Sequence, residues 1–243
     1  MKKDYKKILW KIEEYWNKFY IAKKRHSVDI SSNYKNGFSK FHPRFEQVDT
    51  FNFAESSKAV FVDDAGEYLG LQKCQVKCDT SNLSQSKLVY LIDNHNEILY
   101  PFVEICKVTG KAFDVVHIDA HPDDAEFPGE KINDLNLKNV EKYITHTRIS
   151  DFFDAISDAN TVGEIHRVTH SDNLEFFMPP ENPYILSLDI DIFGPEGDFA
   201  ELKDKVKAIA SAWGGAEAVC IATSPGFIGQ KFARNIIEIF TAN

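Results

Sequence analysis

Residues 184–193 read Tyr-Ile-Leu-Ser-Leu-Asp-Ile-Asp-Ile-Phe, an apolar run that ends in two aspartates. A continuous run of β-branched and other large apolar residues is typical of a strand buried on both faces, as in a parallel sheet. Four other short runs share this character, and stretches with a helical pattern fall between most of them. The predicted strands are 59–62, 88–92, 113–118, 184–190 and 218–221, and the predicted helices are 97–108, 148–157, 200–213 and 230–240.

This alternation predicts an α/β fold of three layers, in which helices cover both faces of a central, mostly parallel sheet. The chain has no internal repeat and no linker rich in Pro or Gly, so we expect residues 1–243 to form a single domain. Residues 1–55 would be a helical and irregular N-terminal extension. Within it, 5–23 has the pattern of an amphipathic helix, and we favour packing on the body over docking of a partner. Its apolar stripe consists of Leu9, Ile12, Trp16 and Phe19.

The composition is that of an ordinary globular protein, with 43% hydrophobic and 27% charged residues. The net charge is −9, but residues 1–25 carry nine Lys/Arg against three Asp/Glu, so the rest of the chain is strongly acidic. An acidic body disfavours nucleic acid as a partner and suits a divalent cation or a cationic substrate. No stretch is long and apolar enough to predict a membrane span. Four cysteines do not make a disulfide scaffold, so we expect a reducing cytoplasm.

Residue types that bind metals follow three of the predicted strands. The segments are Asp-Asn-His-Asn-Glu at 93–97, His-Ile-Asp-Ala-His-Pro-Asp-Asp at 117–124, and Ser-Leu-Asp-Ile-Asp-Ile-Phe at 187–193. Ligands of open α/β sheets bind at the carboxyl ends of the strands. A single aspartate there often caps the next helix. Several buried carboxylates together would repel one another, however, and a divalent cation removes that cost.

The spacing of these residues brings their side chains together, because alternate residues of a strand point to the same face. Four carboxylates and two imidazoles suit Mn²⁺ better than a metal that prefers thiolates. Six side chains also suit two ions better than one. The six predicted ligands are His95, Asp119, His121, Asp123, Asp189 and Asp191.

Together, D-A-H-x-D at 119–123, S-x-D-x-D at 187–191 and the earlier isolated histidine resemble the arginase (ureohydrolase) superfamily. Within it, D-N-H-N-E, H-I-D-A-H-P-D and S-L-D-I-D-I-F, with S-P-G-F-I at 224–228, are similar to a smaller arginase-like family. That family includes peptide arginases of ribosomal natural-product (RiPP) clusters. The resemblance implies an arginase/deacetylase-like fold and conversion of arginine residues in a precursor peptide to ornithine, with release of urea.

The resemblance also implies a binuclear Mn²⁺ centre. One ion would be held by His95, Asp119, Asp123 and Asp189. The other would be held by Asp119, His121, Asp189 and Asp191, so that Asp119 and Asp189 bridge the two. The implied nucleophile is a water between the ions, and Asp123 could accept a hydrogen bond from it and direct it at the guanidinium carbon.

The chain departs from the enzymes that hydrolyse free arginine at the residue that anchors the guanidinium. Aligned on Pro225, Ala222 stands where those enzymes have a glutamate. A guanidinium favours a carboxylate partner, and Glu97 and Asp124 are our candidates for that role, ahead of Glu126. The alternative for each is a helix-start carboxylate or a solvated loop charge.

The proton shuttle of arginases has no histidine at the nearest corresponding spacing in this chain. His146 is our candidate for protonating the leaving amine, with His166 and His170 as rivals. A single histidine is more often structural than catalytic, and His117 is expected in the core. Asp93 could orient the first histidine ligand or cap the next helix.

Two other classes of function are alternatives. A-H-P-D-D at 120–124 resembles the signature of zinc-dependent N-acetylglucosaminyl deacetylases, in which Asp124 would be a ligand and Asp123 the base. That assignment, like a histone-deacetylase-like site with one zinc, accounts for the predicted ligands less completely. A non-catalytic metal- or peptide-binding module on the arginase fold is the other class. The sequence does not indicate an oligomeric state.

Overall fold

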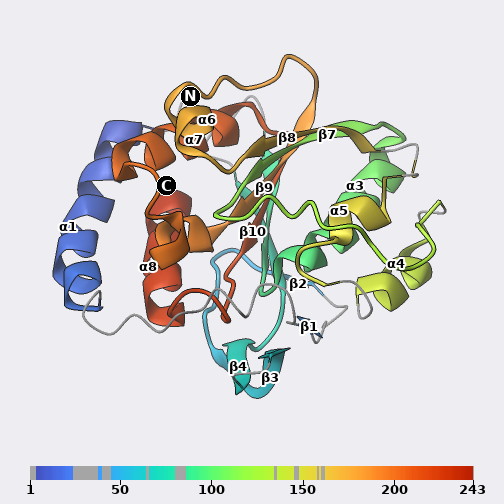
Figure 1. The fold of residues 1–243 in the computed structure, drawn as a ribbon, viewed down its shortest axis with the longest axis horizontal. Helices are drawn as coiled ribbons and strands as arrows, with labels where there is room; N and C mark the ends of the chain where they lie inside the picture. The colour runs from blue at the N-terminus through green and yellow to red at the C-terminus, as the bar shows by residue number, and fades with distance from the viewer. Residues whose placement is uncertain are drawn as a thin grey trace.

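The structure is a computed structural model that describes residues 4–23, 38–39, 45–63, 66–79, 86–133, 136–144, 148–157, 159 and 162–242. It is an α/β fold around a seven-stranded sheet (Figure 1). Strand β5 runs antiparallel to β6, and the other neighbouring pairs are parallel. In sheet order the strands are β2 (Glu46–Gln47), β5 (Gln75–Asp79), β6 (Lys87–Ile92), β10 (Ala218–Ala222), β9 (Tyr184–Asp189), β7 (Phe113–Ile118) and β8 (Val162–Val168).

Helices cover both faces of this sheet, as the alternation of strands and helices predicts. On one face lie α1 (Tyr5–Lys23), α6 (Ser171–Glu175), α7 (Leu202–Gly215) and α8 (Gln230–Thr241). On the other lie α3 (Leu99–Thr109), α4 (Leu137–Ile144) and α5 (Phe152–Ala155). Two buried clusters of apolar side chains fill the two interfaces.

Strand β10 shows why the central strands are apolar without interruption. Val219 and Ile221 belong to the cluster under α1, α7 and α8, whereas Cys220 and Ala222 belong to the cluster under α3. All four are buried, because successive side chains point to opposite faces and both faces are covered. The carboxyl ends of the parallel strands are therefore held rigidly side by side.

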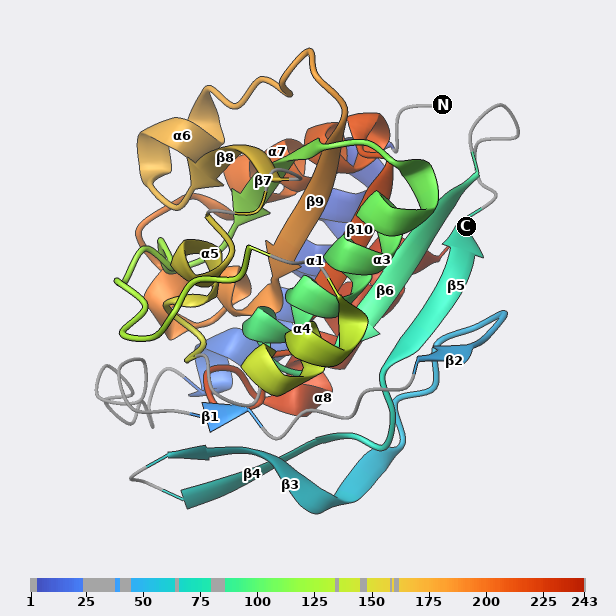
Figure 2. The ribbon, with the colours of Figure 1, turned by 90° about the vertical axis from the view of Figure 1, so that its right-hand side faces the viewer.

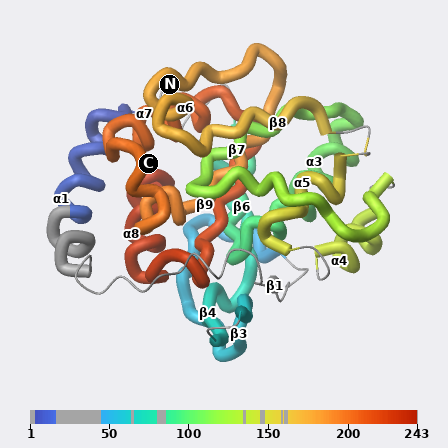
Figure 3. Tube along the Cα trace, in the orientation of Figure 1, coloured from blue at the N-terminus to red at the C-terminus, as the bar shows by residue number. Residues whose placement is uncertain are grey.

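Helix α1 packs on the body and matches its predicted bounds (Figure 3). Ile12 is fully buried, and the Trp16 ring lies 5.5 Å from Phe232 and 6.4 Å from Phe193, between ring centroids. The side chain of Phe19 lies outside the described residues. These contacts confirm the preferred interpretation of the N-terminal helix.

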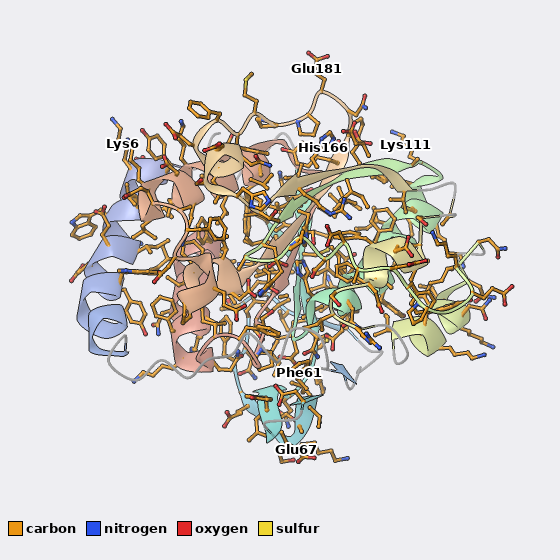
Figure 4. The ribbon with its side chains drawn as sticks, viewed as in Figure 1. Lys6, Phe61, Glu67, Lys111, His166 and Glu181 are labelled. Atoms are coloured by element: carbon orange, nitrogen blue, oxygen red, sulfur yellow. The ribbon has the colours of Figure 1, made fainter. Side chains whose placement is uncertain are left out.

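The run at 59–62 forms a strand, but not in the central sheet, and that part of the prediction is wrong. It belongs to β3 (Glu55–Asp63), which pairs with β1 (Phe38–Ser39) and β4 (Gly66–Leu71) in a separate antiparallel sheet (Figure 2). The nearby β4 competes successfully for β3, because antiparallel pairing needs only a short connection. Phe61 packs towards the body and Glu67 lies at the far end of this small sheet (Figure 4).

Several further elements differ from the sequence prediction, and most of them are short or carry polar residues; α4, α6, β2 and β4 are among those that the prediction misses. Strands β5 and β8 were not predicted, since edge and near-edge strands with one wet face lack a continuous apolar run. The helix predicted at 148–157 is limited to α5, which continues at both ends only as turns. Among the described residues, no helix combines the length and apolarity needed to cross a bilayer.

Replacing Ile12 by Ala should lower the free energy of unfolding by about 2–4 kcal/mol, because it opens a cavity between α1 and the body. Urea unfolding followed by circular dichroism measures this change. Trp10→Ala is the matched control, since Trp10 is 62% exposed on the same helix and its loss should change stability by no more than about 0.5 kcal/mol. Equal effects of the two changes would contradict the packing of α1.

Candidate metal centre

The strand register brings three loops to one point beyond the sheet. Ile118 of β7 pairs with Leu188 of β9, so Asp119 and Asp189 leave the sheet side by side. Ala222 of β10 pairs with both Asp189 and Ile92, which places the end of β6 at the same level. From there the turn after β7 and the short helices η2 (His95–Ile98) and η3 (Ile190–Phe193) supply the remaining predicted ligands.

His95 lies at the centre of a first group of ligand atoms. Its Nδ1 is 2.6 Å from Asp119 Oδ2, 3.4 Å from Asp123 Oδ2 and 3.3 Å from Asp189 Oδ2. Side chains of His95, His117, Asp119 and Asp123 each offer one atom within 4.8 Å of the others, a spacing that could hold a metal ion.

A second group of the same kind lies beside the first. His121 Nδ1 is 3.1 Å from Asp191 Oδ2 and 3.4 Å from Asp119 Oδ1. Asp119, His121 and Asp191 could together hold an ion. Asp119 belongs to both groups and presents a different oxygen to each, as a shared ligand of two ions would.

Several carboxylates are buried close together at this site, and their pKa values reflect both burial and mutual repulsion. Burial and the negative charge of Asp119 raise the pKa of Asp123, and burial with the charges of Asp119 and Asp189 raises the pKa of Asp191. Burial also acts to raise the pKa of Asp119, but hydrogen bonds from His121 and His95 outweigh it and hold that pKa well below its usual range. A divalent cation would relieve the repulsion, so the donor set fits such an ion.

His117 reaches the centre although the sequence suggested only a core position. It is fully buried, and its Nε2 lies 3.5 Å from Asp119 Oδ2 and 3.2 Å from the carbonyl oxygen of His121. Burial lowers the pKa of His117 to about 3, so the ring is neutral at neutral pH. The sequence signal was its position two residues before Asp119, on the same face of the strand.

Two serines that belong to neither ligand group form hydrogen bonds with predicted ligands. Ser187 Oγ lies 2.6 Å from His95 Nε2, on the opposite side of the ring from the carboxylates. Ser224 donates its hydroxyl to Asp189 Oδ2. Ser224 and Asp123 both have φ of 45°, a strained conformation for residues other than glycine, and such strain gathers at functional sites.

The candidate substrate residues lie away from this centre. Glu97 is 1% exposed, and its carboxylate accepts hydrogen bonds from the Asp93 backbone N–H at 3.1 Å and the Asn94 side chain at 2.9 Å. Glu97 therefore holds the turn that carries His95 and does not line the cavity between the ligands. Asp124 is exposed and belongs to neither ligand group.

The candidate shuttle residues are not brought to the centre by any described contact. His146 lies outside the described residues. His166 contacts Asp114 near the start of β7, at 3.6 Å, and His170 is exposed before α6. Asp93 accepts hydrogen bonds from Leu71 N and Thr223 Oγ1, so it ties β4 to the end of β10.

The ligands enclose a cavity of about 10 Å³, roughly the space of one water molecule. It is lined by Asn94, His95, Asp119, His121, Asp123, Ile149, Asp189, Asp191, Ser224 and Phe227. The predicted ligands thus all line one cavity. Comparisons of the chain with family models, curated proteins and solved structures find no match.

Asp119→Asn should weaken Mn²⁺ binding strongly, because Asp119 belongs to both ligand groups. Loss of a residue that only hydrogen-bonds to a metal ligand weakens binding by roughly 10–100-fold, and we expect a larger loss here. Isothermal titration and metal analysis of the purified protein measure this. Asp124→Asn removes the same charge from an exposed position and should bind as the wild type does. Unchanged binding by Asp119→Asn would rule out a shared ligand at this position.

Proposed function

We propose that the protein is a Mn²⁺-dependent hydrolase that converts arginine residues of a peptide to ornithine and releases urea. The observation that carries the proposal is the pair of buried ligand groups joined by Asp119. The arginase-like motifs on the same three loops support the choice of reaction. Four free cysteines, three of them buried, suit action in a reducing cytoplasm.

Two divalent cations at these groups would supply a water of lowered pKa as the nucleophile. In the reaction a C–O bond forms at the guanidinium carbon and the bond from that carbon to the side-chain nitrogen breaks. A proton from the attacking water is transferred to the nitrogen that becomes the ornithine amine, and urea is released. The protein's own part is to place the side chains that would bind the ions. Asp119 lies between the two ligand groups, with His95 next to its Oδ2 and His121 next to its Oδ1.

Asp123 has the second role that the resemblance implies. Its Oδ2 lies 3.4 Å from His95 Nδ1, and the residue lines the cavity between the ligands. A carboxylate there can accept a hydrogen bond from the attacking water and orient it.

The choice of a peptide arginine over free arginine rests on the similarity of the motifs to those of peptide arginases. It is also supported by Ala222, which stands where the enzymes that hydrolyse free arginine have a glutamate.

The test is mass spectrometry of arginine-containing peptides incubated with the Mn²⁺-loaded protein, with a parallel assay for urea. We expect a mass loss equal to urea minus water on an arginine residue. Asp119→Asn should be inactive, because the shared ligand is lost, and a peptide with lysine in place of arginine should be unchanged.

Other outcomes would contradict the proposal in different ways. Turnover of free arginine or agmatine alone would restrict the activity to small guanidines. Release of acetate from an acetylated amino sugar would favour the zinc deacetylase, although Asp124, a ligand in that alternative, is exposed. Tight metal binding with no turnover on a broad arginine-peptide library would favour a binding module.

A further inference from the structure

Glu196 contacts the candidate metal centre from outside both ligand groups. It lies on the short helix η4 (Pro195–Gly197), and one of its carboxylate oxygens forms a hydrogen bond with His121 Nε2. Its side chain is 21% exposed, and that of His121 is 15% exposed. Nothing in the motifs pointed to Glu196, because it follows the last predicted ligand by five residues.

The two nitrogens of the His121 ring have separate partners. Nδ1 faces Asp191 and Asp119, the members of the second ligand group, whereas Nε2 faces Glu196. A carboxylate can only accept, so His121 donates its Nε2 proton to Glu196. In a neutral ring this leaves the lone pair on Nδ1, which is the atom directed at the metal position.

The turn that carries Glu196 is built to hold it in place. Gly194 N donates to the Asp191 carbonyl at 2.5 Å, so η4 folds back directly onto η3. A Cβ at Gly197 would collide with the carbonyl oxygen of Ile192, so this close approach requires glycine. On its other side the His121 ring meets the Phe227 ring, with centroids 5.4 Å apart. The orientation of His121 is therefore determined by Phe227 and Glu196 together.

We propose that Glu196 is a positioning residue that sets the tautomer and orientation of His121 and so tightens metal binding at the second ligand group. The inference rests on the metal centre of the proposed function, but not on the identity of the substrate. Outer carboxylates on metal-binding histidines fix the ring and raise its basicity. His95 has a neutral hydroxyl, Ser187, in the equivalent position, so the two histidines are supported differently.

The experiment is isothermal titration of the full-length, metal-free protein with Mn²⁺, for the wild type and three variants. Glu196→Ala removes the acceptor and should weaken one of the two binding events by about 10–100-fold. Glu196→Gln keeps the size of the side chain and one acceptor oxygen, so it should weaken Mn²⁺ binding less than Glu196→Ala does. Glu201→Gln makes the same charge change at an exposed residue five positions away and should match the wild type.

Thermal unfolding of the metal-free proteins separates positioning from general stability. We expect the Glu196 variants to unfold near the wild-type temperature without metal and to gain less stability from added Mn²⁺. If Glu196→Ala is destabilised without metal, Glu196→Gln decides, since it preserves the turn. Wild-type affinity at both sites in the two Glu196 variants would overturn the inference.

The outcomes also distinguish this inference from the proposed function. Two Mn²⁺ ions bound by the wild type and weakened by Glu196→Ala, with no turnover of any arginine peptide, would support the role of Glu196 and contradict the peptide arginase. Failure of the wild type to bind Mn²⁺ would overturn both.

Discussion

The structure depends on one costly arrangement, the burial of four aspartates at the carboxyl ends of adjacent strands. Asp119, Asp123, Asp189 and Asp191 are all almost inaccessible to water and lie around one small cavity. Hydrogen bonds with His121 and His95 hold the pKa of Asp119 well below its usual range, so this carboxylate stays ionised. Because burying like charges is unfavourable without a cation, this concentration of carboxylates is the strongest physical argument for a metal centre.

The rest of the fold serves to hold these carboxylates together. Their separation follows from the register of β7, β9 and β10, and that register is held by apolar side chains that are buried on both faces. A slip of one residue would turn every side chain of a strand to the opposite face. The buried core thus specifies not only the sheet but also which aspartates meet.

The small antiparallel sheet extends the support beyond the central sheet. The Val60 carbonyl accepts a hydrogen bond from Asn94, the residue before His95, at 3.0 Å. Phe61 packs on Phe227, whose ring contacts His121. The sheet formed by β1, β3 and β4 therefore packs behind two residues that line the cavity, Asn94 and Phe227. That role depends on contacts between residues more than 100 positions apart, such as Phe61 and Phe227.

The α/β class, the N-terminal helix and the clustering of the six ligand types could be predicted from the chain, because they depend on local periodicity and on the ends of buried strands. Strand β8 could not, since an edge strand carries polar residues, nor could the pairing of β3. The hydrogen-bond partners of the histidine rings could not be predicted either, because most of them come from other segments of the chain. His95 contacts Ser187, His117 contacts the carbonyl oxygen of His121, and the His121 ring contacts Glu196. Local pattern determines that the six predicted ligands gather at the strand ends, whereas only long-range packing decides which further residues, such as His117 and Glu196, join them and which atoms meet there.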